Sequence, residues 1–138
     1  MIVVDSSFVY ALLDARDSNH RAATAWYRDV DDELATSPLV LSEVDHLAAR
    51  AGVAALAAFR RDILDDAYFV DWWPGASSAI VEIADRYLDL GLDLMDASLV
   101  AVAGRSKTTL IATFDERHFR AVKPLTGGPA FTILPADA

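Results

Sequence analysis

The chain has 138 residues, of which 54% are hydrophobic, and its formal net charge at pH 7 is −9. This length allows one domain with a proper core, and the absence of cysteine excludes disulfides and thiolate metal sites. Residues 1–13 do not resemble a signal peptide, and no apolar run approaches the roughly 18 residues of a membrane helix, so we expect a soluble, cytoplasmic domain spanning residues 1–138.

The first half of the chain alternates short strands with amphipathic helices. The β-branched run 2–4 predicts a buried strand that ends at Asp5, and Ser6 or Ser7 is expected to cap a helix that reaches residue 13. Ser18 is expected to cap a helix over residues 19–30, and a weak strand covers 34–36. Ser37 and Pro38 form a strong helix start, which predicts a helix over 38–51 that stops at Gly52.

The second half continues this alternation. A helix over 53–64 precedes a strand over 68–70, and Ser77 and Ser78 are expected to cap a helix that ends at Leu90. Another helix begins near Asp96 and runs to residue 104. A strand over 109–113, a helical turn over 116–119 and a strand over 131–134 complete the pattern. We therefore predict the α/β class, with a parallel sheet covered on both faces.

Four carboxylates lie within or directly after apolar runs that should be buried: Asp5, Glu43, Asp96 and Asp115. A carboxylate at the edge of a core is unfavourable unless it has a partner, and no Lys or Arg lies within three residues of Asp5, Glu43 or Asp96. Ligands of open α/β sheets bind at the carboxyl ends of the strands, where Asp5 and Asp115 are expected. The sequence therefore predicts that one edge of the sheet gathers all four acids around a divalent cation.

The chemistry of such a cluster points to phosphodiester hydrolysis. Carboxylate oxygens are the ligands that Mg²⁺ or Mn²⁺ prefers, and the lack of His or Cys at the same points argues against zinc. A bound cation with open positions can activate water and neutralise a phosphate oxygen. No glycine-rich phosphate loop is present. The negative net charge alone argues against nucleic-acid binding, but the last third of the chain is comparatively basic.

Together these segments resemble PIN-domain ribonucleases of the VapC toxin type, over nearly the whole chain. The matching segments are residues 3–7 (VVDSS), 42–43 (SE), 94–101 (LMDASLVA) and 112–115 (ATFD), the last followed by His118 and Phe119. The resemblance implies a three-layer α/β/α fold and a Mg²⁺- or Mn²⁺-dependent endoribonuclease that acts on RNA, usually as a homodimer. It also implies a small antitoxin that wraps the toxin and places a basic side chain among the acids.

Within this resemblance, the catalytic acids correspond to Asp5, Glu43, Asp96 and Asp115. We predict that Asp5, Asp96 and Asp115 hold the metal, and that Glu43 completes the cluster or positions the water. Ser6 and Thr113 correspond to the family's supporting hydroxyl residues. Asp93 is either a further acid at the metal, in competition with Asp115, or the cap of its helix.

Several residues keep more than one interpretation. Arg117, Arg120 and Lys123 are candidate phosphate contacts or ordinary surface residues, and His118 lies on the surface or touches RNA. Trp72 and Trp73 stack on bases or pack against the protein.

Three further functions remain as alternatives. They are a PIN-domain nuclease outside a toxin–antitoxin pair, an inactive PIN-like binding module, and a phospho-acceptor receiver domain. The receiver needs two adjacent acids after the first strand, where only Asp5 is present, and its acceptor would have to be Asp71.

Overall fold

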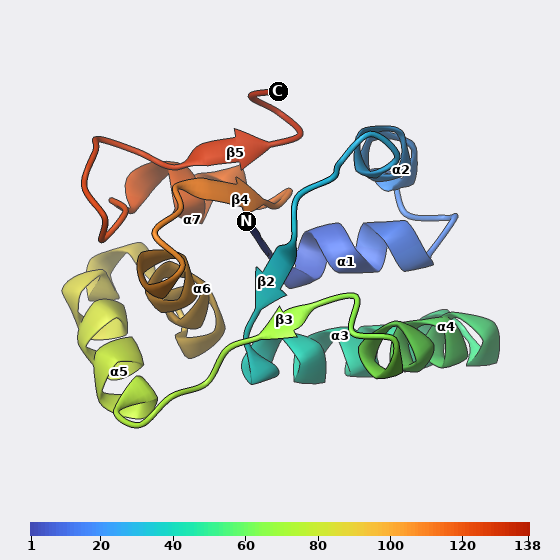
Figure 1. The fold of residues 1–138 in the computed structure, drawn as a ribbon, viewed down its shortest axis with the longest axis horizontal. Coiled ribbons are helices and arrows are strands. Elements are labelled where there is room, and N and C mark those ends of the chain that lie inside the picture. Colours follow the sequence, from blue (N-terminus) through green and yellow to red (C-terminus); the bar gives the residue numbers. More distant parts are fainter.

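A sheet of five parallel strands places the carboxylates. The computed structural model describes residues 1–138, and its strands are β1 (Ile2–Val4), β2 (Leu34–Thr36), β3 (Phe69–Val70), β4 (Leu110–Ala112) and β5 (Thr132–Leu134). Their spatial order is β3-β2-β1-β4-β5, with every pair parallel (Figure 1). Receiver-type sheets have the order 2-1-3-4-5, so the receiver alternative was wrong.

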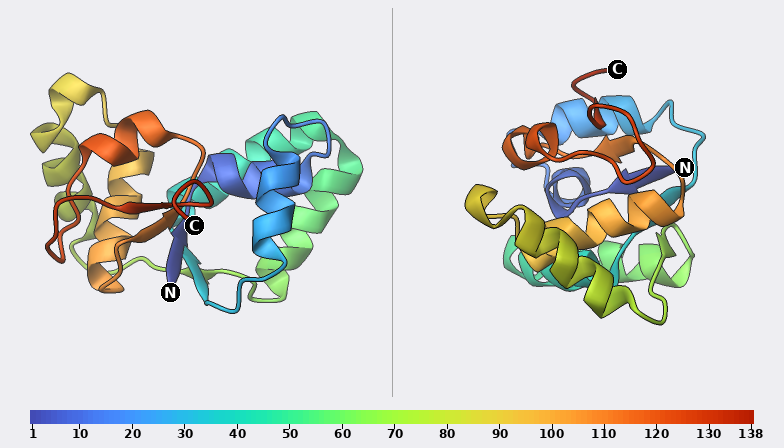
Figure 2. Two further views of the ribbon diagram at one scale, coloured as in Figure 1. Left: turned by 90° about the horizontal axis from the view of Figure 1, so that it is seen from above. Right: turned by 90° about the vertical axis from the view of Figure 1, so that its left-hand side faces the viewer.

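Helices cover the sheet on both faces. They are α1 (Ser6–Leu13), α2 (His20–Tyr27), α3 (Pro38–Ala51), α4 (Val53–Leu64), α5 (Ala76–Arg86), α6 (Leu94–Arg105) and α7 (Glu116–Ala121), with a 3-10 turn over Leu88–Leu90. Figure 2 shows α1–α4 on one side of the strands and α5–α7 on the other. The predicted three-layer α/β/α fold is confirmed. None of the helices is long and apolar enough to cross a membrane.

The central strand and α6 supply much of the core. Val3 and Val4 of β1 are fully buried, and every residue of α6 from Asp96 to Ala103 is buried as well. A helix that is surrounded by protein needs no polar face, which explains the weak apolar periodicity of this segment. Asp96 is therefore carried into the interior by a helix whose other buried residues are apolar or small.

The predicted start of α3 was right, because local capping decided it. The Ser37 hydroxyl accepts a hydrogen bond from Val40 N, 3.4 Å away, with Pro38 at the first position of α3. The cap of α1 is the Asp5 carboxylate, whereas Ser6 or Ser7 was predicted. α3 ends at Gly52, whose φ of 137° is available to glycine, as predicted.

Other predicted starts were wrong. α5 follows Gly75, which has a φ of 88°, so Ser77 and Ser78 lie inside its first turn and cap nothing. α2 begins at His20 and ends at Tyr27, short of the predicted residue 30, and Ser18 does not cap it. α6 begins at Leu94 because the Asp93 carboxylate caps it, which puts Asp96 in the first turn.

An ion pair between a buried carboxylate and a half-exposed guanidinium holds the carboxyl end of α6. Asp71, which follows β3 and is 6% exposed, accepts a 2.8 Å hydrogen bond from Arg105 Nε. The Arg105 guanidinium also lies over the Trp73 ring, 4.3 Å from its centroid. Trp73 therefore packs against the protein, whereas the neighbouring Trp72 remains 47% exposed. The contact joins the segment after β3 to the carboxyl end of α6.

Replacing Arg105 with Ala is expected to lower the free energy of unfolding by about 2 kcal/mol, because Asp71 would stay buried without its partner. Chemical denaturation measures this loss. Arg60→Ala is the matched control, since Arg60 pairs with Asp45 on the surface. If the free energy of unfolding fell equally little in both variants, the Asp71–Arg105 pair would not contribute measurably to stability.

Candidate active site

Asp5 lies at the centre of the sheet's carboxyl edge, directly after β1. It is 3% exposed, and its Oδ1 accepts a 2.7 Å hydrogen bond from Ser6 N as the cap of α1. The Ser6 hydroxyl is 3.4 Å from the same oxygen, so Ser6 supports Asp5 chiefly through its backbone. Burial raises the pKa of the Asp5 carboxyl, and hydrogen bonds to Thr113, Ser7 and Ser6 oppose this rise.

Two hydroxyls orient the second oxygen of Asp5. Thr113 Oγ1 donates to Oδ2 at 2.7 Å and Ser7 Oγ donates to it at 2.9 Å. The same hydroxyls accept from the backbone: Thr113 from Asp115 N at 2.9 Å, and Ser7 from Phe114 N at 3.0 Å. Asp5 is thus tied to the loop that carries Asp115. The sequence reasoning chose Thr113 but missed Ser7, for which the Ser6-Ser7 pair was the only signal.

Asp96 is the acid of this group whose carboxylate has no hydrogen-bond partner. It is 5% exposed, and its carboxylate accepts no hydrogen bond; the nearest cationic group, His118 Nδ1, is 3.6 Å away. Burial, followed by the charges of Asp93, Asp5 and Asp115, raises its pKa to about 7. A bound cation would stabilise the ionised form of a buried carboxylate that has no hydrogen-bond partner.

Asp115 caps α7 and bonds His118. Its Oδ1 is 3.4 Å from His118 N, and its Oδ2 is 2.7 Å from His118 Nδ1. The hydrogen bond to Asp115 is the largest cause of a raised His118 pKa. His118 is therefore the one basic side chain in contact with the acids, and it adds positive charge there when it is protonated. The sequence reasoning placed His118 on the surface or against RNA; its signal was the three-residue spacing from Asp115.

Two carboxylate oxygens and one imidazole nitrogen could together hold a divalent cation, so the expectation of no nearby His, which argued against zinc, was wrong. One oxygen each of Asp96 and Asp115 and one ring nitrogen of His118 all lie within 4.8 Å of one another. Asp5 belongs to the same electrostatic group, because its charge and that of Asp115 both raise the pKa of Asp96. We call Asp5, Asp96 and Asp115 the acid cluster. Carboxylates held this closely repel one another, and a Mg²⁺ or Mn²⁺ ion would remove that repulsion.

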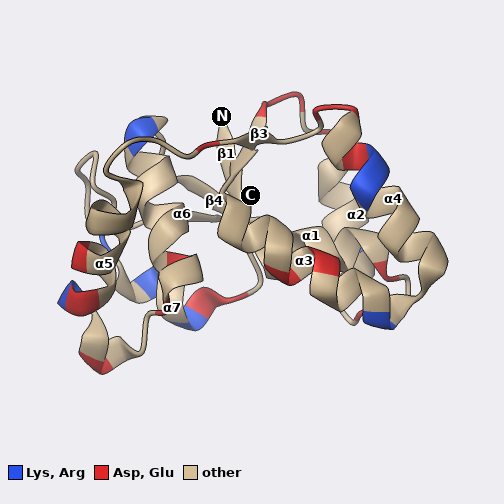
Figure 3. Ribbon diagram, turned by 90° about the horizontal axis from the view of Figure 1, so that it is seen from below, with Lys and Arg blue, Asp and Glu red and all other residues tan.

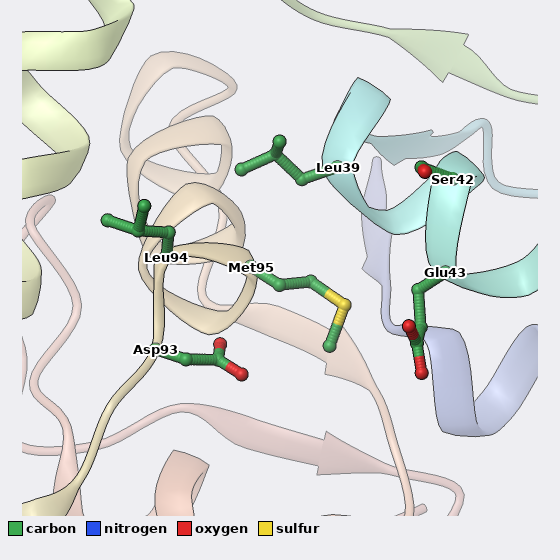
Figure 4. A pocket seen from close by; sticks show the side chains of 6 residues that line it. All are labelled: Leu39, Ser42, Glu43, Asp93, Leu94 and Met95. Carbon is green, nitrogen blue, oxygen red and sulfur yellow. The ribbon is translucent and has the colours of Figure 1, made fainter.

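Glu43 and Asp93 line a cleft beside the acid cluster. A cleft of about 340 Å³ separates α3 from the start of α6, and its lining is Leu39, Ser42, Glu43, Asp93, Leu94 and Met95. In Figure 4 the Glu43 and Asp93 carboxylates lie on opposite sides of this cleft, with the Met95 side chain reaching between them. Asp93 Oδ1 accepts from Asp96 N at 2.8 Å, so Asp93 caps α6.

The predicted basic residues divide into two kinds. Arg120 is held by two carboxylates, Glu116 on its own helix and Asp137 near the end of the chain. Arg117 and Lys123 are exposed, and neither side chain forms a hydrogen bond or ion pair. Figure 3 shows acidic segments of α3, α6 and α7 around the centre of one face, with basic residues on α7 beside them. Arg120 therefore braces α7 through its contacts with Glu116 and Asp137.

Comparisons with known proteins agree with this geometry. The sequence model of the PIN domain family matches residues 2–124. Ribonuclease VapC26 of Mycobacterium tuberculosis is 34% identical, and the alignment covers 97% of this chain and 100% of that protein.

Solved structures resemble the fold as well. VapC20 of Mycobacterium tuberculosis, a toxin that cleaves the sarcin–ricin loop, superposes with a TM-score of 0.80 at 25% identity, covering 94% of this chain and 100% of that one. PAE2754 of Pyrobaculum aerophilum superposes with a TM-score of 0.57 at 26% identity, covering 89% of this chain and 85% of that one.

Asp96→Asn is expected to stabilise the metal-free protein at pH 8, on the order of 2 kcal/mol, because it removes a buried charge. Between the ordinary carboxyl pKa of 3.8 and about 7, the folded protein keeps an Asp96 proton that the unfolded chain has released. The metal-free wild type should therefore lose stability as the pH rises through this range, and Asp96→Asn should reduce that slope, while Asp5, whose pKa is also raised by burial, keeps part of it.

Urea titrations at pH 4.5, 6 and 8 in EDTA measure the effect, with the exposed Asp89→Asn as the control. If wild type and Asp96→Asn showed the same pH dependence, Asp96 would not be electrostatically strained.

Proposed function

The chain belongs to the PIN domain family, and from this membership we propose that it is a metal-dependent endoribonuclease, the toxin of a type II toxin–antitoxin pair. The observation that carries the proposal is the buried Asp96 carboxylate, which accepts no hydrogen bond and lies beside Asp5 and Asp115. The relatives that are named ribonuclease and toxin support the choice of reaction. Residues 1–138 act as one PIN-like domain in this proposal.

The proposed cofactor is Mg²⁺ or Mn²⁺, held by Asp5, Asp96 and Asp115. When bound, such an ion lowers the pKa of a water and neutralises charge on a phosphate oxygen. The oxygen donors of the acid cluster favour these ions over softer metals. Glu43, across the cleft from Asp93, completes the cluster or positions the water.

The surrounding residues prepare the acids for this task. Ser7 and Thr113 fix both the rotamer of Asp5 and the loop before Asp115, so these two acids keep one relative orientation. His118 holds a proton at Nδ1 against Asp115 in the metal-free state. A cation in the cluster would weaken the hold of Asp115 on that proton, because both positive charges share the same carboxylate.

Substrate contacts follow from the free basic residues. Arg117 and Lys123 lie on α7 and just after it, close in the chain to Asp115, and their charges are unpaired. We propose that they bind RNA phosphates beside the acid cluster. This local pair offsets the overall charge of −9, which would otherwise oppose binding of a polyanion.

Two protein partners belong to the proposal. A small antitoxin would place a basic side chain among the acids, where an arginine finds unsatisfied carboxylate oxygens. A second copy of the chain would cover an apolar cleft between α3, α5 and α6, which is lined by Leu39, Trp72, Ser77, Ile80, Val81 and Leu94. The alternative function is a PIN-domain nuclease that has no antitoxin. The gene immediately upstream distinguishes the two functions, because a short reading frame with the features of an antitoxin would favour the toxin assignment.

Asp5→Asn is expected to reduce RNA cleavage in Mg²⁺ or Mn²⁺ at least a hundredfold, on the order of the losses that follow removal of one group acting on the reacting charge. A gel assay on a mixed RNA pool measures the rate, and EDTA should abolish wild-type cleavage. Asp45→Asn, an exposed change on α3, serves as the control. Cleavage that is indifferent to EDTA, or equal in wild type and Asp5→Asn, would refute the proposed chemistry.

Arg117→Ala and Lys123→Ala are expected to raise the KM for RNA severalfold with little change in kcat, because phosphate contacts contribute mainly to binding. Their effect should shrink as the salt concentration rises. Arg120→Ala is the matched comparison, since its guanidinium already contacts Glu116 and Asp137. A larger KM effect in Arg120→Ala than in Arg117→Ala would reverse the assignment.

A further inference from the structure

A buried pair of serines joins the two helices that flank the cleft. Ser37, the cap residue of α3, and Ser98, in the second turn of α6, are both fully buried, and their Oγ atoms are 2.7 Å apart. They lie 61 positions apart in the chain. Neither serine contacts the acid cluster, and the resemblance to the PIN family assigned a role to neither.

The protons of this pair can be placed. Ser98 Oγ donates to Met95 O at 2.6 Å, a common bond for serine within a helix. Since each hydroxyl has a single hydrogen, Ser37 must donate to Ser98, and Ser37 is free to accept from Val40 N. The bonds therefore run in one direction, from the first turn of α3 to the carbonyl of Met95.

We call this chain of hydrogen bonds the relay. Its two ends lie beside the proposed site residues. Met95 directly precedes Asp96, and α3 carries Glu43 further along the cleft, as Figure 4 shows. Thr36, next to Ser37, makes a parallel contact: its buried hydroxyl donates to Val4 O at 2.9 Å, directly before Asp5. Buried hydroxyls thus hold the backbone in front of both Asp5 and Asp96.

Such restraints have an electrostatic reason. The charges of Asp93, Asp5 and Asp115 each raise the pKa of Asp96, which means that they repel its ionised form. That repulsion pushes the amino end of α6 away from β1. Apolar contacts oppose this displacement but are not directional. A hydrogen bond between buried hydroxyls is directional, so it fixes both the distance and the register of the two segments.

We propose that Ser37 and Ser98 are positioning residues, which set the spacing between α3 with Glu43 and the Asp96 turn of α6, and so the affinity of the acid cluster for its divalent cation. This inference rests on the proposed function. The relay acts through backbone that adjoins the acids, as the outer partners of metal ligands do.

The test compares Ser98, in α6, with a second buried hydroxyl that lies away from the acids. Ser98→Ala removes the relay and leaves the Ser37 cap in place. Thr108→Val removes a buried hydroxyl that precedes β4 and donates to Met1 O at 2.9 Å, away from the acids. Calorimetric titration of the metal-free proteins with Mn²⁺ gives the affinity, and urea unfolding in EDTA gives the stability.

We expect Ser98→Ala to bind Mn²⁺ about tenfold more weakly than the wild type, which is the lower end of the range for loss of an outer partner of a metal ligand. The Mn²⁺ affinity of Thr108→Val should stay within about twofold of that of the wild type. Both variants should lose stability. Ser37→Ala/Ser98→Ala should bind no more weakly than the weaker single variant, because the two hydroxyls act as one unit. If Ser98→Ala does not fold, Ser98→Cys replaces it, because cysteine keeps a weak donor of similar size. The Mn²⁺ affinity of Ser98→Cys should lie between that of the wild type and the roughly tenfold weaker affinity expected for Ser98→Ala.

Equal Mn²⁺ affinity in wild type and Ser98→Ala, or equal losses in Ser98→Ala and Thr108→Val, would overturn the positioning role and leave the nuclease proposal intact. Absence of Mn²⁺ binding and of RNA cleavage by the wild type would refute the proposed function itself, and this inference with it.

Discussion

The repulsion among the buried carboxylates is the constraint that organises this protein. Asp5 and Asp96 are almost inaccessible to water, and Asp115 lies close enough to raise the pKa of both. A fold gains nothing in stability from such an arrangement, because desolvation and like charge both oppose it. The acids persist only because a well-packed α/β scaffold stabilises their positions, and that imbalance supports the proposal that the site is functional.

The scaffold meets this constraint with hydroxyl groups instead of counter-charges. Ser7 and Thr113 bond Asp5 directly, while Thr36 and the Ser37–Ser98 pair hold the backbone in front of Asp5 and Asp96. A hydroxyl satisfies a carboxylate or carbonyl without neutralising the cluster, so its attraction for a cation is preserved. The larger cationic groups act elsewhere: Arg105 fastens the far end of α6, and Arg120 braces α7. His118 is the one basic side chain that contacts the acids, and it brings positive charge to them when it is protonated.

Local signals in the sequence predicted much of this arrangement. The runs before Asp5 and Asp115 marked two strand ends, and Ser37-Pro38 with Gly52 marked both ends of α3, because caps and glycine turns act within a few residues. The start of α5 was missed because the helix follows Gly75, which adopts a left-handed conformation, and no side chain caps it. The start of α6 was misplaced because Asp93 had two possible roles, and the structure shows that it caps the helix.

By itself the sequence determined the α/β class, the parallel sheet and the identity of the acids, because each depends on composition and on the order of neighbouring residues. Only the tertiary structure decided which groups meet. It placed Glu43 across a cleft from Asp93, paired Arg120 with acids, and brought His118 to Asp115 and Ser37 to Ser98. Contacts of this kind depend on how α3, α6 and α7 pack around the sheet, and side-chain packing leaves no periodic trace in the chain.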